Sequence, residues 1–374
     1  MTIAATELSV VQYRSFAEYA LRLDPHVTVL VGRNAVGKTN LVEALQLLTA
    51  GSSFRKPSSA ELLRQGAPAG RARLLLEGEG RRLEMGLELA EGKRFFTRNG
   101  KRTTASGVRG VLPSVLFCPD DLDMVKRSAS ARRGALDSFG VQLNDQYAKL
   151  LSTYERTVEQ RNNLLRDCPP ADLLEVWDES LAVTGAQLLM HRRALLARIR
   201  EHFVEVYRAI APHETPDVAY ESTLGELGDE REAIAERFRR ELRARRADEL
   251  RRGMTLVGPH RDEIAFTIDG RAARDFGSQG QQRSIVLAWK IAEVQVTRDI
   301  LGRPPLLLLD DVMSELDASR REAIMRFVTD DIQTVITTTN LGYFTDGVLD
   351  RARVVHVGAS NWGLSLFEVA ERWE

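Results

Sequence analysis

The sequence predicts an α/β protein in which a helical lobe interrupts a lobe built on a parallel sheet. Short β-rich runs alternate with turns up to about residue 118, and a helical periodicity takes over from residue 120 to about residue 252. Strand patterns return after Gly253, separated by helical stretches, as in a parallel sheet with crossover connections. A chain of 374 residues is long enough for two or three domains.

The individual elements are predicted from the spacing of apolar residues. The segments ARLLLEG and RLEMGLEL are early strands, and RNGK is a turn between strands. After Gly253 the strand patterns are EIAFTIDG, PPLLLLDD, TVITTT and ARVVHVG. Between these regions, apolar residues recur at helical spacing in two stretches, which contain Leu150, Tyr154 and Val158, and then Leu174, Trp177, Leu181 and Leu188.

A glycine-flanked turn, VTVLVGRNAVGKTN, follows the predicted strand Val27–Val31 and opens a predicted helix. It matches the phosphate-binding pattern G-x-x-x-x-G-K-[ST], in which backbone N–H groups and a lysine hold nucleotide phosphates and a hydroxyl reaches Mg²⁺. A plain glycine turn is the alternative, but the flanking strand and helix favour a P-loop. We therefore predict a P-loop NTPase that uses ATP and Mg²⁺, with a nucleotide-binding set of Gly32, Arg33, Asn34, Ala35, Val36, Gly37, Lys38 and Thr39.

The segment PPLLLLDD supplies the acidic partner that such a loop needs. Four leucines predict a buried strand, and Asp310 lies at its carboxyl end, where ligands bind in open α/β sheets. Asp310 is predicted to hold Mg²⁺ together with Thr39, and Asp311 to polarise the attacking water. The predicted catalytic set is thus Asp311, Asp310 and Lys38. By itself this segment would equally suit a leucine strand that ends in a solvated acidic turn.

Two further segments, FGSQGQQRS and DDVMSELD, resemble the signature motif and the D-loop of ABC-type ATPases. Ser278, Gly280 and Gln281 match the serine, the last glycine and the glutamine of that signature. The signature opens a predicted helix and lies 32 residues before Asp310, in the order found in that family. The resemblance implies that Ser278 caps the γ-phosphate of an ATP held by a second subunit, so that a head-to-tail homodimer sandwiches two ATP molecules. A helix N-cap is the alternative role for Ser278, and the two roles are compatible.

The chain also resembles the RecF family of bacterial DNA repair and recombination mediators along nearly its whole length. The segments that carry this resemblance are VGRNAVGKTNLVEAL, SSFR, QRNNLLR, VWDESLA, GPHRDE, SQGQQR and LLLDDVMSELD. The resemblance implies an ABC-type ATPase head like those of Rad50 and SMC proteins, without their long coiled coil. It also implies an ATP-dependent dimer that binds DNA at single-strand gaps or junctions and, with RecR and RecO, helps to load RecA in support of replication and the SOS response. A weak DNA-stimulated ATPase would act as a switch, with slow hydrolysis driving release.

This resemblance divides the chain into two lobes. Residues 1–118 and 303–374 would form the ATP-binding lobe I, which carries the P-loop, the acidic strand and the D-loop. Residues 119–302 would form lobe II, with a helical arm at 120–252 and the signature motif at 276–283.

Three positions depart from the related ATPases. Ala35 stands where such loops usually have glycine, so the position either needs no positive φ or carries strain. Asp311 replaces the glutamate common in transporters, and Thr339 occupies the place of their switch histidine. Both changes favour a slow timer over the alternative function, the ATP-binding subunit of a membrane transporter. A P-loop small-molecule kinase would not explain the signature motif or the D-loop.

DNA contacts are predicted from the distribution of arginines. Nine arginines and five acidic residues lie between Arg231 and Arg252, enough for a basic helix face that neutralises DNA phosphates. A face that is merely solvated is the alternative. No base-reading motif is visible, so binding should not depend on sequence. The candidate contacts are Arg239, Arg240 and Arg243, with Arg132 and Arg133 next.

Composition sets the remaining expectations. Lys and Arg number 52 against 53 Asp and Glu, so net charge neither favours nor excludes nucleic acid. No apolar run approaches a membrane span and the N-terminus does not resemble a signal peptide, so we expect no membrane partner. Cys118 and Cys168 lack metal-ligand spacing, which is typical of a reducing compartment. We therefore predict a cytoplasmic protein.

Overall fold

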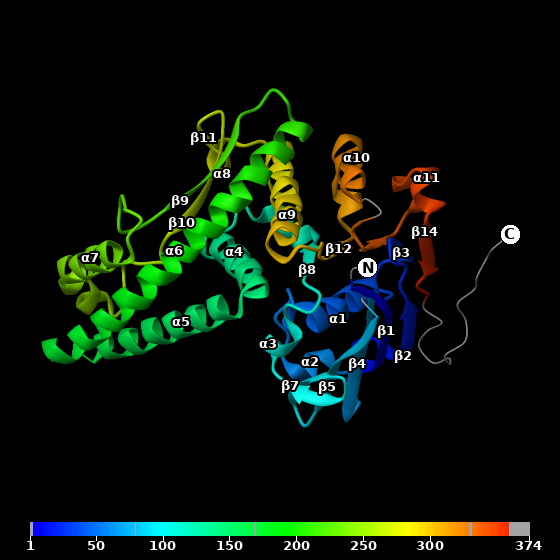
Figure 1. Ribbon diagram of the computed structural model, residues 1–374, viewed down its shortest axis with the longest axis horizontal. Coiled ribbons are helices and arrows are strands. Elements are labelled where there is room, and N and C mark those ends of the chain that lie inside the picture. Colours follow the sequence, from blue (N-terminus) through cyan, green and yellow to red (C-terminus); the bar gives the residue numbers. More distant parts are fainter. Residues whose placement is uncertain (1–2, 79, 168–169, 329–330, 359–374) are drawn as a thin grey trace. The chain divides into compact units, whose positions relative to one another are not determined.

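The computed structural model describes residues 3–78, 80–167, 170–328 and 331–358. The chain forms two compact units, Met1–Asp121 with Glu293–Glu374 and Leu122–Ala292. Figure 1 shows their elements along the chain. Cys118 is buried and its Sγ lies 3.4 Å from Asp121 Oδ2, whereas Cys168 lies outside the described residues.

The first unit contains a five-stranded parallel sheet in the order β14-β3-β13-β12-β8. Every residue of β3, β12 and β13 is buried, as expected for strands covered on both faces. The predicted strands in PPLLLLDD, TVITTT and ARVVHVG are therefore confirmed. The five strands are β3 (Val27–Val31), β8 (Ser114–Phe117), β12 (Leu306–Asp310), β13 (Thr334–Thr338) and β14 (Ala352–His356).

A six-stranded antiparallel sheet, in the order β2-β1-β4-β5-β6-β7, completes the framework of this unit. The predicted RNGK turn joins β6 to β7, and Asn99 (φ 50°) and Gly100 (φ 73°) both adopt the positive φ of a tight hairpin. The strands are β1 (Ala4–Tyr13), β2 (Phe16–Arg22), β4 (Ala69–Gly78), β5 (Arg81–Ala90), β6 (Lys93–Arg98) and β7 (Lys101–Thr103).

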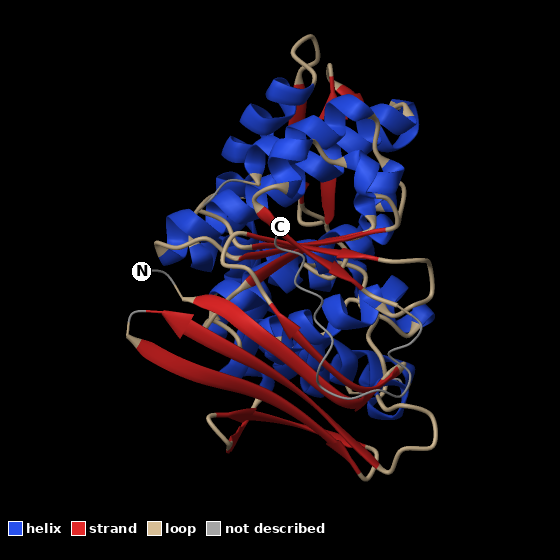
Figure 2. Cartoon of the chain, turned by 90° about the vertical axis from the view of Figure 1, so that its right-hand side faces the viewer, coloured by secondary structure: helices blue, strands red, loops and turns tan. Residues whose placement is uncertain are grey.

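Helix α1 (Lys38–Ala50) contacts strands of both sheets of the first unit. Figure 2 shows helices between these two sheets. Leu41, Val42, Leu45 and Leu48 are buried on it, as the sequence predicts. The shorter helices of this unit are α2 (Ser59–Leu62), α3 (Ala105–Val108), η1 (Pro119–Asp123), η2 (Val312–Glu315), α10 (Ala318–Phe327), η3 (Leu341–Tyr343) and α11 (Asp346–Leu349).

The second unit is mainly helical, but it also contains a small antiparallel sheet that was not predicted from the sequence. The strands are β9 (Pro216–Glu221), β10 (Glu263–Ile268) and β11 (Arg271–Ala272), in the order β11-β10-β9. The helices are α4 (Ala129–Leu143), α5 (Asp145–Arg166), α6 (Ala171–Ile210), α7 (Arg231–Arg252), α8 (Ala273–Phe276) and α9 (Gln279–Leu301), whose last turns belong to the first unit.

The prediction that EIAFTIDG joins the parallel sheet is wrong. This segment forms β10, which pairs with β9 and β11 in antiparallel register. Its burial alternates, with Ile264, Phe266 and Ile268 buried and the residues between them partly exposed. Alternation is typical of a sheet with one solvated face, whereas the unbroken leucine run of β12 is typical of a parallel core strand.

A buried ion-pair network joins α5, α6 and α7. Arg161 is fully buried, and its guanidinium donates to Asp178 Oδ1 (2.7 Å), Glu249 Oε2 (2.7 Å) and Thr255 Oγ1 (2.9 Å). Glu249 is also fully buried and accepts from the backbone N–H of Leu256. Because each charge has partners, the network holds three helices together without leaving an isolated buried charge.

We predict that Arg161→Leu lowers the free energy of unfolding by about 3–5 kcal/mol, because it leaves the carboxylates of Asp178 and Glu249 without their buried cation. Urea denaturation followed by circular dichroism measures this change. Arg239→Met is the matched control, since Arg239 pairs with carboxylates that are half exposed or more, and it should cost less than about 1 kcal/mol. Equal costs for both variants would contradict a structural role for the buried network.

Candidate nucleotide-binding site

The P-loop connects β3 to α1 and has two positions that require glycine. Gly37 has φ 105°, a conformation that L side chains rarely adopt, and a Cβ there would lie 2.7 Å from the ring of Phe16. At Gly32 a Cβ would collide with the carbonyl oxygen of Val357. Ala35 has φ 66°, so this position does need a positive φ and the loop carries strain where related loops have glycine.

Lys38 begins α1 and is almost completely buried. Its ammonium donates to the carbonyl oxygens of Gly32 (2.6 Å) and Arg33 (3.0 Å), so the side chain folds back over the loop. Burial lowers the pKa of Lys38, and the carboxylates of Asp311 and Asp310 oppose this shift. A cation held among oxygen acceptors in this way is placed to exchange them for phosphate oxygens.

Thr39 and Asp310 meet although they lie 271 residues apart. The hydroxyls of Thr39 (3.0 Å) and Thr337 (2.8 Å) both donate to Asp310 Oδ1. Burial raises the pKa of Asp310, while these two hydrogen bonds act in the opposite direction. A hydroxyl and a carboxylate are the hard oxygen donors that suit Mg²⁺ alongside nucleotide phosphates, so the residues present fit this cation.

Asp311 adopts a left-handed conformation, with φ 53° and ψ 22°. Its backbone N–H donates to Thr337 Oγ1 (2.9 Å), which fixes the turn. Its Oδ1 is buried and has no hydrogen-bond partner among the described residues. Burial raises the pKa of Asp311, Lys38 lowers it and Asp310 adds to the rise. A strained residue with an unsatisfied carboxylate oxygen is typical of a site completed by a ligand or by water.

A charged cluster beside the P-loop helix was not identified from the sequence as part of the site. Glu43 on α1 is fully buried and accepts two hydrogen bonds from Arg14, both 2.8 Å long, and one from Ser53 (2.7 Å). Arg55 donates to Asn40 (3.0 Å), and its charge lowers the pKa of Asp310. Except for Arg14, the sequence carried these residues only within two segments of the family resemblance, VGRNAVGKTNLVEAL and SSFR.

The signature residues Ser278, Gly280 and Gln281 belong to the second unit, and the P-loop to the first. Ser278 is exposed at the start of α9 and forms a reciprocal cap with Gln281. The backbone N–H of Gln281 donates to Ser278 Oγ (3.2 Å), and that of Ser278 donates to Gln281 Oε1 (2.8 Å). The N-cap role of Ser278 is therefore present in the single chain.

Two of the arginines predicted to contact DNA belong to the second unit, where Arg132 is buried and Arg133 is half-buried. Arg132 is only 3% exposed, and its guanidinium binds both carboxylate oxygens of Glu263 at 2.8 and 2.6 Å as well as three backbone carbonyls. Arg133 donates to the carbonyl oxygen of Asp262 (2.6 Å). Arg132 therefore acts as an internal cross-link, and its burial argues against a DNA contact.

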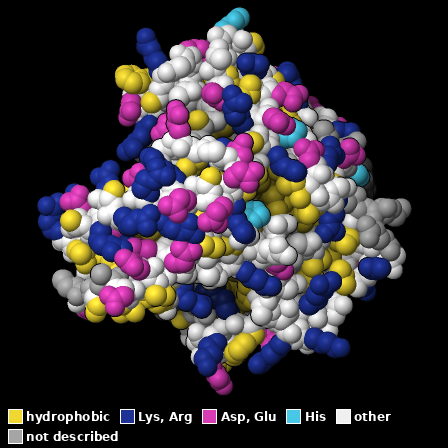
Figure 3. Space-filling view, turned by 60° about the vertical axis from the view of Figure 1, so that its left-hand side comes forward, with side chains coloured by type: hydrophobic (Ala, Val, Ile, Leu, Met, Phe, Trp, Pro, Cys, Tyr) yellow, Lys and Arg dark blue, Asp and Glu magenta, His cyan; other side chains and the backbone are white. Residues whose placement is uncertain are grey.

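The other three candidates lie on α7 with acidic neighbours. Arg239 forms ion pairs with three glutamates, and Arg243 pairs with Glu236 (3.3 Å). Arg240 is exposed. Figure 3 shows Lys and Arg side chains interspersed with Asp and Glu on the visible face. No helix in the described ranges has the length and apolar character needed to cross a bilayer.

Comparison with known proteins identifies the family. The model of the RecF/RecN/SMC N terminal domain matches residues 4–358. The DNA replication and repair protein RecF of Synechocystis sp. is 36% identical over 376 residues, covering 96% of each chain. The chain belongs to the RecF family. RecF of Pelotomaculum thermopropionicum is 39% identical over 349 residues, covering 91% of this chain and 95% of that protein.

Solved structures agree with the membership of the RecF family. The recombination mediator protein RecF-ATPrS in the RecFOR pathway has a TM-score of 0.86 at 29% identity, covering 92% of this chain and 94% of that chain. An SMC head domain from Pyrococcus furiosus has a TM-score of 0.56 at 14% identity, covering 96% and 94%, and shares the fold. The predicted family and the predicted ATPase-head fold are thus confirmed. Membership of a DNA repair family also argues against a transporter subunit.

We predict that Lys38→Met abolishes most nucleotide binding, because the loop loses the buried ammonium that lies against its carbonyl oxygens. Isothermal titration with ATP and Mg²⁺ measures the affinity, and we expect a loss of at least about 100-fold, roughly 2.7 kcal/mol. Lys93→Met, at an exposed lysine of the antiparallel sheet, is the control and should bind as wild type does. An affinity for the Lys38 variant within about threefold of wild type would remove Lys38 from the site.

Proposed function

We propose that this chain is an ATP-dependent DNA-binding protein of recombinational repair. Its ATP-driven homodimer binds DNA at single-strand gaps or junctions and, with RecR and RecO, helps to load RecA, in support of replication and the SOS response. The observation that carries this proposal is the meeting of Thr39 and Asp310 beside Lys38 in a chain of the RecF family.

The site supports slow ATP hydrolysis. The backbone N–H groups of the P-loop and Lys38 would neutralise the phosphates, and Thr39 with Asp310 would hold Mg²⁺, which supplies further positive charge when bound. Asp311 has a free buried Oδ1 that can accept a proton from the attacking water. The short side chain and strained backbone of Asp311 limit how closely its carboxylate can approach the attacking water. These features favour a weak ATPase that acts as a timer for release, and its stimulation by DNA is part of the proposal that rests on the family resemblance.

The signature motif supports a composite site shared by two protomers. Ser278 is exposed and belongs to the second unit, whereas the P-loop belongs to the first. In a head-to-tail pair with two-fold symmetry, each protomer would contribute Lys38 to one ATP and Ser278 to the other. ATP would then bind the dimer more tightly than the monomer, and mass action would link nucleotide to assembly.

Partners follow from the family and from the charged surface. A related RecF structure is named for the RecFOR pathway, which supports RecO and RecR as partners, and RecA follows from the family resemblance. A cytoplasmic location fits such a role. For DNA, we propose α7, where the exposed Arg240 lies beside Arg239 and Arg243. DNA phosphates would compete with the glutamates that pair with Arg239 and Arg243. Because such contacts are to the DNA backbone, binding should be sequence-independent and should weaken as the salt concentration rises.

The dimer is tested with Ser278→Arg, which puts a bulky cation where a hydroxyl should meet the partner's γ-phosphate. We expect this variant to bind ATP nearly as wild type does, because its own P-loop is intact, yet to remain monomeric and hydrolyse little ATP. Sedimentation velocity with ATP and Mg²⁺ measures the assembly. Mixing the Ser278→Arg variant with the Lys38→Met variant should restore at most one complete site per heterodimer.

Ser152→Arg is the control for this experiment, since it adds the same charge at an exposed serine of α5. It should form the ATP-induced dimer normally. A Ser278→Arg dimer as tight as wild type would remove the signature motif from the mechanism.

The DNA contact is tested by the salt dependence of binding. Replacing Arg239, Arg240 and Arg243 by Ala should weaken binding to gapped DNA and flatten the plot of log affinity against log salt, by about 0.9 for each phosphate that the variant no longer neutralises. Fluorescence anisotropy at several salt concentrations gives the slope. The control replaces Arg82, Arg98 and Lys101, which are exposed in the antiparallel sheet, with the same change in net charge. Equal slopes for both triple variants would place the DNA site elsewhere.

A further inference from the structure

The first residue of the signature motif is an exposed aromatic side chain. Phe276 is 71% exposed, the largest exposed fraction among the exposed large hydrophobic residues of the described chain. It ends α8, two residues before Ser278. Hydration does not stabilise an exposed phenylalanine ring. An exposed ring at this position is therefore typical of a surface that contacts another protein.

The backbone around Phe276 is firmly held. Gln282 on α9 donates to the carbonyl oxygens of Ala273 (3.1 Å) and Gly277 (3.0 Å), which ties α8 to the signature helix. Gly277 passes so close to α8 that a Cβ would lie 2.5 Å from the carbonyl oxygen of Ala273. The Phe276 ring is therefore presented from a fixed backbone, at a fixed separation from Ser278.

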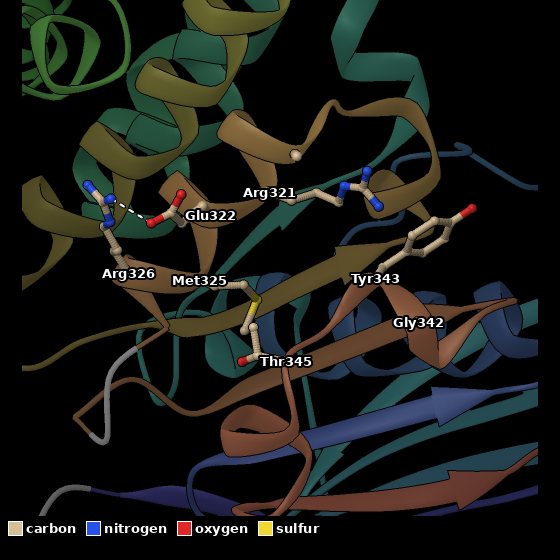
Figure 4. Close-up of a pocket in the computed structure, with 8 residues that line it drawn as sticks. Arg321, Glu322, Met325, Arg326, Gly342, Tyr343 and Thr345 are labelled. Carbon is tan, nitrogen blue, oxygen red and sulfur yellow. Dashed lines mark hydrogen bonds and ion pairs between the residues drawn. The ribbon is translucent and has the colours of Figure 1, made fainter.

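A pocket of about 520 Å³ lies in the first unit between α10 and the segment 342–345 (Figure 4). Met325 and Tyr343 contribute a thioether and an aromatic ring to its wall. The guanidinium of Arg321 lies 4.8 Å from the centre of the Tyr343 ring, and its buried Nε has no hydrogen-bond partner among the described residues. The pocket thus offers apolar surface together with a guanidinium cation stacked on an aromatic ring.

Both walls of this pocket originate at the edge of the sheet that carries the nucleotide site. One wall, η3 and the residues after it, follows β13, whose Thr337 binds Asp310. The other wall, α10, follows Asp311 through η2. The chain from Thr337 to Gly342 spans five residues, which limits their separation to about 17 Å.

We propose that Phe276 of one protomer inserts into the pocket lined by Arg321, Met325 and Tyr343 of its partner when ATP joins the two protomers. This inference rests on the proposed dimer, in which Ser278 reaches the partner's γ-phosphate. Phe276 is two residues from Ser278, about 7 Å along an extended chain, and its ring adds further reach. The occupant of the pocket is thus a second copy of this chain.

The chemistry of the two surfaces is complementary. An aromatic ring packs favourably against a thioether and against the edge or face of another ring. Asp275 is exposed beside Phe276 and would bring a carboxylate toward the guanidinium of Arg321, which lines the pocket. Two-fold symmetry gives each dimer two copies of this contact. Removing the ring therefore weakens the dimer at two positions, and both losses raise the dissociation constant.

The experiment measures the ATP-induced dimer of the full chain by sedimentation velocity. We expect Phe276→Ala to raise the dimer dissociation constant on the order of 100-fold, from about tenfold at each of the two contacts. Met325→Ala should also weaken the dimer, and the double variant should be little weaker than Phe276→Ala, because both changes remove the same contact. ATP affinity of each monomer should stay at the wild-type value. The matched control is Val176→Ala on α6, where the side chain is 67% exposed, and it should dimerise normally.

Three results would overturn the inference. Phe276→Ala could dimerise as wild type does, its effect could add independently to that of Met325→Ala, or Val176→Ala could weaken the dimer equally. These outcomes differ from failure of the proposed function, in which wild type forms no ATP-induced dimer or Ser278→Arg dimerises normally. Thermal unfolding of each monomer shows that the variants are folded.

Discussion

The buried carboxylate of Asp310 is the feature on which the nucleotide site depends. A carboxylate that is 3% exposed is costly unless it is hydrogen-bonded, and here two threonine hydroxyls supply the bonds. Asp310 and Thr337 are register partners in adjacent parallel strands, so a slip of one residue would turn one of them away. Thr39 arrives from β3 through the P-loop. The alignment of three strands thus fixes the geometry of the candidate metal ligands.

Two residues with a strained backbone conformation lie at the same edge of the sheet. Ala35 and Asp311 both have positive φ, and each follows a fully buried strand that leaves it little freedom. Such conformations persist only when the surrounding structure imposes them. The rigid sheet therefore supports both the candidate phosphate-binding loop and an acid whose Oδ1 has no hydrogen-bond partner among the described residues.

Arginine has two different roles in the second unit. Arg161 and Arg132 are buried and bind carboxylates or carbonyls, so they connect helices and strands from within. On α7, by contrast, arginines and glutamates pair at the surface. A count of arginines along the chain combines these roles, and only burial separates an internal cross-link from a cation that DNA can reach. Burial is equally informative for an apolar residue, because the proposed contact of Phe276 rests on its exposure outside the core.

The sequence by itself determined the P-loop, the strand that ends at Asp310 and the helix that follows the signature, because each depends on residues close together in the chain. It also carried the resemblance that comparison confirmed. The tertiary structure alone decided the antiparallel pairing of β10, the burial of Arg132 and the role of Thr337 as the second hydroxyl on Asp310. It also showed that Ala35 takes a positive φ. Strand pairing, burial and hydrogen bonding between distant residues depend on how the chain packs, and local spacing does not contain that information.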